Sequence, residues 1–190
     1  MFATSFHELK VLILTIKIKI SENSCNSWQE KIILICVICG KKNRKMSKNV
    51  FVEGPISPEF IAESIAKHQS KHTIGAHNIF LGQVRADVIH DNTVVAIDYS
   101  AYTDMANEAL HTIREKAFAK FDLTCMHIYH SLGIVKAGEI CLFVFVSATR
   151  RKQVYEATEA IVNWIKTDVP IFGKEMFEND TFTWKQNTNG

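Results

Sequence analysis

Residues 141–146 read Cys-Leu-Phe-Val-Phe-Val (CLFVFV), six consecutive apolar side chains. A strand with one face in water alternates apolar and polar side chains, whereas an unbroken apolar run indicates burial on both faces. This segment therefore predicts a central strand over 140–147. A turn at Ala137-Gly138 joins it to another expected strand over 125–130.

The segments around this strand alternate between helical and strand-like patterns. Ser57 and Pro58 suit the cap and first position of a helix, and apolar residues recur at helical spacing in two later segments. No glycine-rich phosphate loop follows a strand. We predict an α+β fold in two layers, with helices packed on a mainly antiparallel sheet. The expected helices cover about 57–68, 103–121 and 151–166, the expected strands 76–84 and 94–102, and a hairpin is expected around 178–180.

The chain has 190 residues, 47% hydrophobic and 22% charged, which is enough for one sizeable core. Residues 1–45 carry eight basic and three acidic residues, so the fourteen basic and seventeen acidic residues that follow make the rest mildly acidic. Turn signals and periodicity become regular from Met46 onward. We expect residues 46–190 to form a single domain and residues 1–45 to be a non-native or disordered extension before a natural start at Met46.

The charge and hydropathy patterns exclude two classes of partner. A mildly acidic body has no general electrostatic reason to bind nucleic acid. The apolar run at 11–20 contains Lys17 and Lys19 and is far shorter than the roughly 20 residues that span a bilayer. No clear signal-peptide cleavage site follows it. We expect no nucleic-acid or membrane partner, and a cytoplasmic location.

The five cysteines do not form the even framework of a small secreted protein, which favours reduced thiols. Cys36 and Cys39 have C-x-x-C spacing but lack the second pair that completes a zinc site. Cys125 and Cys141 lie in apolar strand contexts, so we expect inert core thiols.

The histidines also give no recognisable metal motif. His68 and His72 are four residues apart and can share a helix face, but without a third ligand we expect them at the surface. His127 and His130 are three residues apart, so on a strand they point to opposite faces. The sequence therefore predicts no metal site.

Positive side chains gather at three junctions between expected elements, where loops often carry function. If they converge, arginines can bind phosphate oxygens bidentately and lysines can act as mobile charges or proton donors. The ordinary alternative is a solvated face, with a lysine at a helix C-terminus favoured by the macrodipole alone. The six residues are Arg85, Arg150, Arg151, Lys152, Lys166 and Lys174.

Several segments in order resemble the large, catalytic subunit of molybdopterin synthase, the MoaE family. They are FLGQVR at 80–85, VSATRR at 146–151, YEATEAIVNWIKT at 155–167 and VPIFGKE at 169–175. The resemblance covers about residues 50–185. It implies an α/β hammerhead-type fold, a dimer of large subunits, and a heterotetramer with a small ubiquitin-like sulfur carrier at each end.

The resemblance also implies an activity. The C-terminal Gly-Gly thiocarboxylate of the carrier enters a pocket, where cyclic pyranopterin monophosphate receives two sulfurs to become the dithiolene of molybdopterin. No cofactor is implied. Because the thiocarboxylate is the nucleophile, the enzyme needs to neutralise phosphate and donate protons to leaving oxygens. A lysine whose pKa is lowered by neighbouring cations can do this near neutral pH.

The family's site residues are carried over by position. Lys166 matches the lysine that ends the last helix and is expected to act on the intermediate, with Lys174 assisting. Arginine 150 stands where the family commonly has histidine, and Gly173 stands where many members have a second lysine, with Lys174 one place later. The expected substrate-binding residues are Arg85, Arg150, Arg151, Gln83 and Glu175.

The two departures leave an alternative open. A non-enzymatic α+β module that binds a phosphorylated metabolite, or acts mainly as a docking partner, would use the same cations. Such a module would retain the precursor unchanged.

Overall fold

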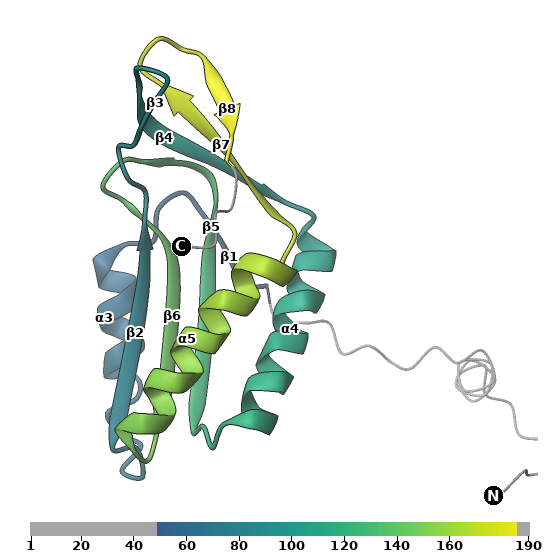
Figure 1. The fold of residues 1–190 in the computed structure, drawn as a ribbon. Helices are drawn as coiled ribbons and strands as arrows, with labels where there is room; N and C mark the ends of the chain where they lie inside the picture. The colour runs from purple at the N-terminus through teal and green to yellow at the C-terminus, as the bar shows by residue number, and fades with distance from the viewer. Residues whose placement is uncertain (1–48, 186–190) are drawn as a thin grey trace, which may run out of the picture. The chain divides into compact units, whose positions relative to one another are not determined.

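The computed structural model describes residues 49–185 (Figure 1). The expected helices and strands are present, so the α+β class is confirmed. Their bounds agree within a few residues, except that the strand expected over 125–130 continues to Lys136. The predictions for residues 1–45, including the Cys36 and Cys39 pair, lie outside the described residues. The elements are β1 (Phe51–Glu53), α3 (Pro58–Ala66), β2 (Ala76–Gln83), β3 (Val88–Ile89), β4 (Asn92–Ala101), α4 (Thr103–Lys120), β5 (Cys125–Lys136), β6 (Ile140–Ala148), α5 (Arg151–Asp168), β7 (Ile171–Phe177) and β8 (Phe182–Trp184).

The sheet runs in the order β2-β6-β5-β4-β7-β8. These pairs are antiparallel, and β1 adds a short parallel pairing to β5. Strand β6 lies between β2 and β5, and every residue from Cys141 to Ala148 is buried. The central position predicted from CLFVFV is confirmed. The expected C-terminal hairpin is also present as β7 and β8.

Helices cover both faces of the central strands. Leu142, Val144 and Val146 of β6 belong to the main core, which α4 and α5 cover. Phe143 and Phe145 alternate with them and form a smaller core with Ile56 and Ile61 beside α3. The sequence did not reveal that α3 packs on the opposite face, which adds a third layer in this half of the sheet.

The ends of α3 and α5 follow from local chemistry. The Ser57 hydroxyl accepts the Phe60 amide hydrogen at 3.3 Å, and Pro58 occupies the first turn, where its missing N–H costs nothing. At the end of α5, Pro170 cannot donate a helical hydrogen bond, and the chain turns into β7. Helix α5 thus delivers its last turn to the side of β7.

Within residues 49–185, no helix combines the length and apolar character required to cross a membrane.

Candidate functional site

A cavity of about 460 Å³ lies where the end of β2, the last turn of α5 and the start of β7 meet. Its size is in the range of small-molecule pockets. Three of its side chains are cations, from Arg85, Lys166 and Lys185, and Asp87 is the single carboxylate among its lining residues. The predicted residues Arg85, Gln83 and Lys166 are therefore brought together.

Arg85 and Lys166 reach this cavity from separate elements. Arg85 lies two residues after the end of β2, and its Nη2 is 2.9 Å from Asp87 Oδ2. The Arg85 side chain is 79% exposed, so this ion pair is weak and can be exchanged for a ligand anion. Lys166 lies in the last turn of α5, where the helix dipole favours a positive charge.

The cavity wall also holds a group of buried, uncharged side chains. The Tyr99 hydroxyl donates to Cys141 Sγ at 3.4 Å, and the Cys141 thiol donates to the Gly82 carbonyl at 3.3 Å. Burial, followed by the neighbouring Cys141, raises the pKa of Tyr99, and burial raises the pKa of the Cys141 thiol. The pKa of His130 is lowered by burial. The thiol thus remains protonated and is a poor nucleophile.

Lys185 is a cavity residue that the sequence did not identify. Its Nζ lies 2.9 Å from Oε1 of Glu175, a carboxylate that is only 8% exposed. The Lys185 amide donates to the Gly173 carbonyl at 2.9 Å, and a side chain at position 173 would lie 3.4 Å from Lys185 Cβ. Because glycine has no side chain, position 173 leaves room for the Lys185 side chain to pack against the backbone of β7. The hairpin register that creates this contact is not readable from spacing alone.

Lys174 lies elsewhere. It alternates along β7 with the buried residues Gly173 and Glu175, so its side chain leaves the other face of the strand. Its Nζ lies 3.7 Å from the centre of the Phe182 ring in β8. Lys174 is not among the residues that line the cavity.

Arg150 and Arg151 are at the opposite end of α5 from Lys166. Lys166 lies fifteen helical positions after Arg151, which corresponds to about 22 Å. Neither arginine lines the cavity, and the adjacent Lys152 pairs with Glu156 at 3.7 Å. The six cations therefore do not converge within one chain.

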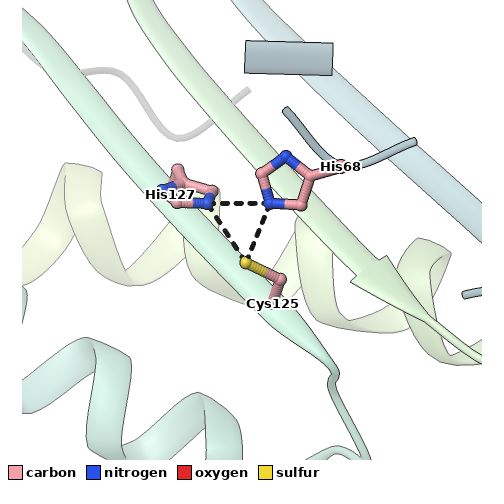
Figure 2. A group of neighbouring side chains, drawn as sticks. All are labelled: His68, Cys125 and His127. Atoms are coloured by element: carbon pink, nitrogen blue, oxygen red, sulfur yellow. Dashed lines mark hydrogen bonds between the residues drawn. The ribbon is translucent and has the colours of Figure 1, made fainter. Parts of the chain in front are cut away.

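A second polar group was not anticipated. His68, expected at the surface, is only 6% exposed, so that prediction is wrong. Its Nε2 lies 3.1 Å from Cys125 Sγ, which is half-buried and contacts polar atoms rather than apolar core (Figure 2). His127 and His130 do lie on opposite faces of β5, as predicted, because His127 contacts His68 whereas His130 packs on Tyr99.

The fold and the cavity define an α+β protein with a small positively charged pocket at the end of its last helix, suited to an anionic ligand. The chain belongs to the MoaE family: residues 52–168 match the family described as MoaE protein.

Similarity to known sequences and solved structures supports this family assignment. The molybdopterin synthase catalytic subunit of Aspergillus fumigatus is 33% identical over 121 residues, which are 64% of this chain and 64% of that relative. The match thus spans under two thirds of that relative's length. The crystal structure of molybdopterin synthase from Staphylococcus aureus has a TM-score of 0.64 at 29% identity and covers 72% of this chain and 96% of that one. A complex of subunits 1 and 2 of molybdopterin-converting factor from Helicobacter pylori has a TM-score of 0.61, covering 72% and 89% of the two chains. At 19% identity it shows the fold alone.

Proposed function

We propose that this chain is the catalytic subunit of a molybdopterin synthase, a cytoplasmic sulfurtransferase. It converts cyclic pyranopterin monophosphate to molybdopterin with sulfur from the C-terminal thiocarboxylate of a small carrier subunit. The observation that carries this proposal is the meeting of Arg85, Lys166 and Lys185 at one cavity of about 460 Å³.

The charge of the cavity supports an anionic substrate. The body of the protein is mildly acidic, so the three cations are a local feature and do not extend a basic surface. A guanidinium binds phosphate oxygens in a fork, and Arg85 can replace its exposed contact with Asp87 by such a pair. The Gln83 side chain, also at the cavity, offers an amide for a neutral hydrogen bond.

The two lysines have different tasks in this proposal. The thiocarboxylate sulfur attacks a carbon of the pterin precursor, and an oxygen leaves with a proton. Water then hydrolyses the resulting thioester, which leaves the sulfur on the pterin and the carrier as its carboxylate. Lys166, in the last turn of α5, donates that proton or acts directly on the intermediate. Lys185 supplies the second ammonium, oriented by Glu175 at 2.9 Å, and takes the assisting role that the sequence assigned to Lys174.

Arg150 and Arg151 act on the substrate only if another copy of the chain presents them. Both lie about 22 Å along α5 from Lys166 and cannot reach the cavity of their own chain. We propose a homodimer in which these arginines complete the partner's cavity. A carrier bound to each large subunit then gives a heterotetramer.

The test is to mix the purified full-length chain with thiocarboxylated carrier and the cyclic pterin precursor. The proposal predicts a dithiolene product and a carrier returned as the carboxylate. A non-enzymatic module would bind the precursor and release it unchanged, and that result would refute the sulfurtransferase.

A further inference from the structure

Two histidines and a cysteine, far apart in the sequence, meet on the α3 side of the sheet. His68 lies in the turn after α3, whereas Cys125 and His127 are at the start of β5, two residues apart and on the same face. Their side-chain atoms form a triangle: His68 Nε2 to Cys125 Sγ, Cys125 Sγ to His127 Nε2, and His127 Nε2 to His68 Nε2 are each 3.1 Å (Figure 2).

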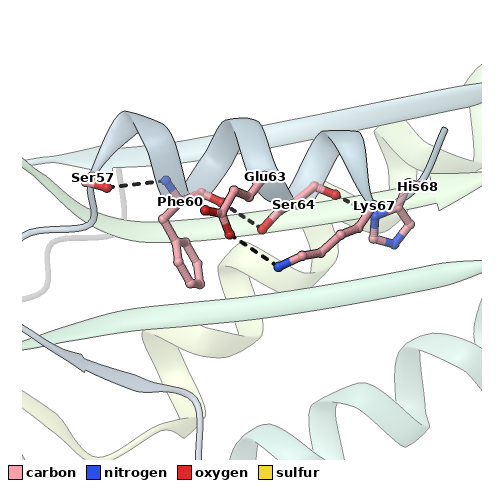
Figure 3. A network of polar contacts seen from close by, with 6 residues as sticks. All are labelled: Ser57, Phe60, Glu63, Ser64, Lys67 and His68. Atoms are coloured by element: carbon pink, nitrogen blue, oxygen red, sulfur yellow. Dashed lines mark hydrogen bonds and ion pairs between the residues drawn. The ribbon is translucent and has the colours of Figure 1, made fainter.

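A hydrogen bond on the side of the ring away from the triangle fixes the orientation of His68. Its Nδ1 lies 2.6 Å from the Ser64 carbonyl oxygen in the last turns of α3 (Figure 3). A carbonyl only accepts, so Nδ1 carries the proton, and in the neutral ring Nε2 presents its lone pair to the triangle. This is the arrangement by which proteins hold metal-binding histidines, with the second ring nitrogen donating to a backbone carbonyl.

Hydrogen bonds alone cannot satisfy the triangle. With neutral rings, the three edges share at most two protons, one from the Cys125 thiol and one from His127 Nε2. At least one 3.1 Å contact would then oppose two lone pairs. A cation at the centre of the triangle removes the conflict, since all three atoms become ligands.

We propose that His68, Cys125 and His127 bind one Zn²⁺ ion. Imidazole and thiolate ligands favour zinc over magnesium or calcium, which prefer oxygen. Tetrahedral zinc with bonds of about 2.0–2.3 Å separates its ligand atoms by about 3.3–3.6 Å. Each pair of the three atoms is now 3.1 Å apart, so they need to move apart by only a few tenths of an ångström.

The surroundings admit the ion and a fourth ligand. Cys125 and His127 are also among the residues that line a cavity of about 330 Å³, which offers room for a water molecule as the fourth ligand. Lys71 Nζ lies 3.6 Å from Cys125 Sγ, and its exposed, flexible side chain can move away from an arriving cation. The nearest further histidine, His77, is bonded through Nδ1 to Ser147 Oγ at 2.8 Å.

The bound ion would fasten the end of α3 to the sheet. Helix α3 is held by a small core of four buried residues, so one metal bridge to β5 adds substantially to its attachment. None of the three ligands lines the cavity that contains Lys166. The zinc site is thus independent of the proposed sulfur transfer.

The experiment uses the full chain with Cys36 and Cys39 replaced by serine, so that the C-x-x-C pair does not contribute metal. The chelator-treated protein is titrated with Zn²⁺ and with Co²⁺, whose thiolate charge-transfer and tetrahedral d–d absorption report the ligands. We expect one ion per chain, a cobalt spectrum with a thiolate band, and a higher melting temperature with zinc than with chelator.

Cys125→Ser and His127→Gln are the ligand variants, and His72→Gln is the matched control, since His72 is exposed and four residues from His68. Each ligand variant should abolish the thiolate band or weaken zinc binding at least tenfold, while the control retains both. Far-ultraviolet circular dichroism verifies that each variant folds. If a variant unfolds, the rate of alkylation of Cys125 in the parent chain is measured instead, with and without zinc. The proposal is overturned if the chain does not bind zinc, or if folded ligand variants bind zinc unchanged. It is also overturned if zinc does not slow the alkylation of Cys125.

Discussion

Lys185 Nζ and Glu175 Oε1 are 2.9 Å apart and join the strand that follows α5 to the residue after β8 at the edge of the positively charged cavity. Glu175 is 8% exposed and Lys185 is 34% exposed, so the buried carboxylate holds the ammonium in a defined direction. An arrangement of this kind positions a lysine better than an exposed ion pair, which loses its energy to water and side-chain entropy.

Replacing Lys185 with alanine should lower the rate of precursor conversion by about a hundredfold, the lower end of what a positioned proton donor contributes. Lys174→Ala is the matched comparison from the same hairpin, since its Nζ lies over Phe182 and not in the cavity. Turnover with saturating carrier measures both variants. A larger loss for Lys174→Ala than for Lys185→Ala would reverse the assignment.

A lysine introduced at position 173 should restore part of the activity that Lys185→Ala loses. In the double variant Gly173→Lys/Lys185→Ala, a lysine at 173 enters the side from which the Lys185 stem has been removed. Alanine at 185 removes the contact with Lys185 Cδ and keeps Cβ, 3.4 Å from the new Cβ, whereas Ile97 Cγ2 lies at 3.1 Å and must shift slightly. We expect the double variant to recover part of the activity lost in Lys185→Ala. If the double variant is no more active than Lys185→Ala, an ammonium at this point of the cavity is not what the reaction requires.

His130 predicts a dependence of stability on pH. Burial lowers the pKa of His130 in the folded state below the ordinary histidine value of about 6.5, so the unfolded chain binds more protons in the pH window below about 6.5. The free energy of unfolding should therefore fall as the pH drops through that window. His130→Asn retains a donor for the Ser131 carbonyl, which His130 Nδ1 contacts at 2.8 Å, and should flatten the slope. Urea unfolding at several pH values measures this, and an unchanged slope in the variant would contradict the assignment.

Mixed dimers test whether two copies build one cavity. Lys166→Ala and Arg151→Ala should each be strongly impaired alone. If Arg151 serves the partner's cavity, a 1:1 mixture after subunit exchange contains one intact site in every mixed dimer, giving about a quarter of the wild-type activity. Activity that stays at the average of the two variants would indicate that Arg151 acts within its own chain or not at all.

The fold was largely predictable because its signals are local. The apolar run at 141–146 required a doubly covered strand, Ser57 and Pro58 marked a helix start, and Pro170 marked a helix end. The side on which α3 packs was not predictable, since it depends on Phe143 and Phe145 pairing with Ile56 and Ile61 across a long connection.

The site was predictable in part. Arg85 and Lys166 could be found because they flank regular elements and match a family pattern. Lys185 could not, since its place follows from the register of β7 and β8 across Gly173. The contact of His68 with Cys125 joins residues 57 apart in the sequence, and no motif spacing indicates it.

The most direct test of the account is the conversion of cyclic pyranopterin monophosphate by the wild-type chain and by Lys166→Ala, each supplied with thiocarboxylated carrier and followed by mass spectrometry of the pterin. If Lys166 is catalytic, the wild type gives a product with two added sulfurs and the variant reacts at least about a hundredfold more slowly. Near-wild-type conversion by Lys166→Ala would contradict a catalytic role for the lysine at the end of α5.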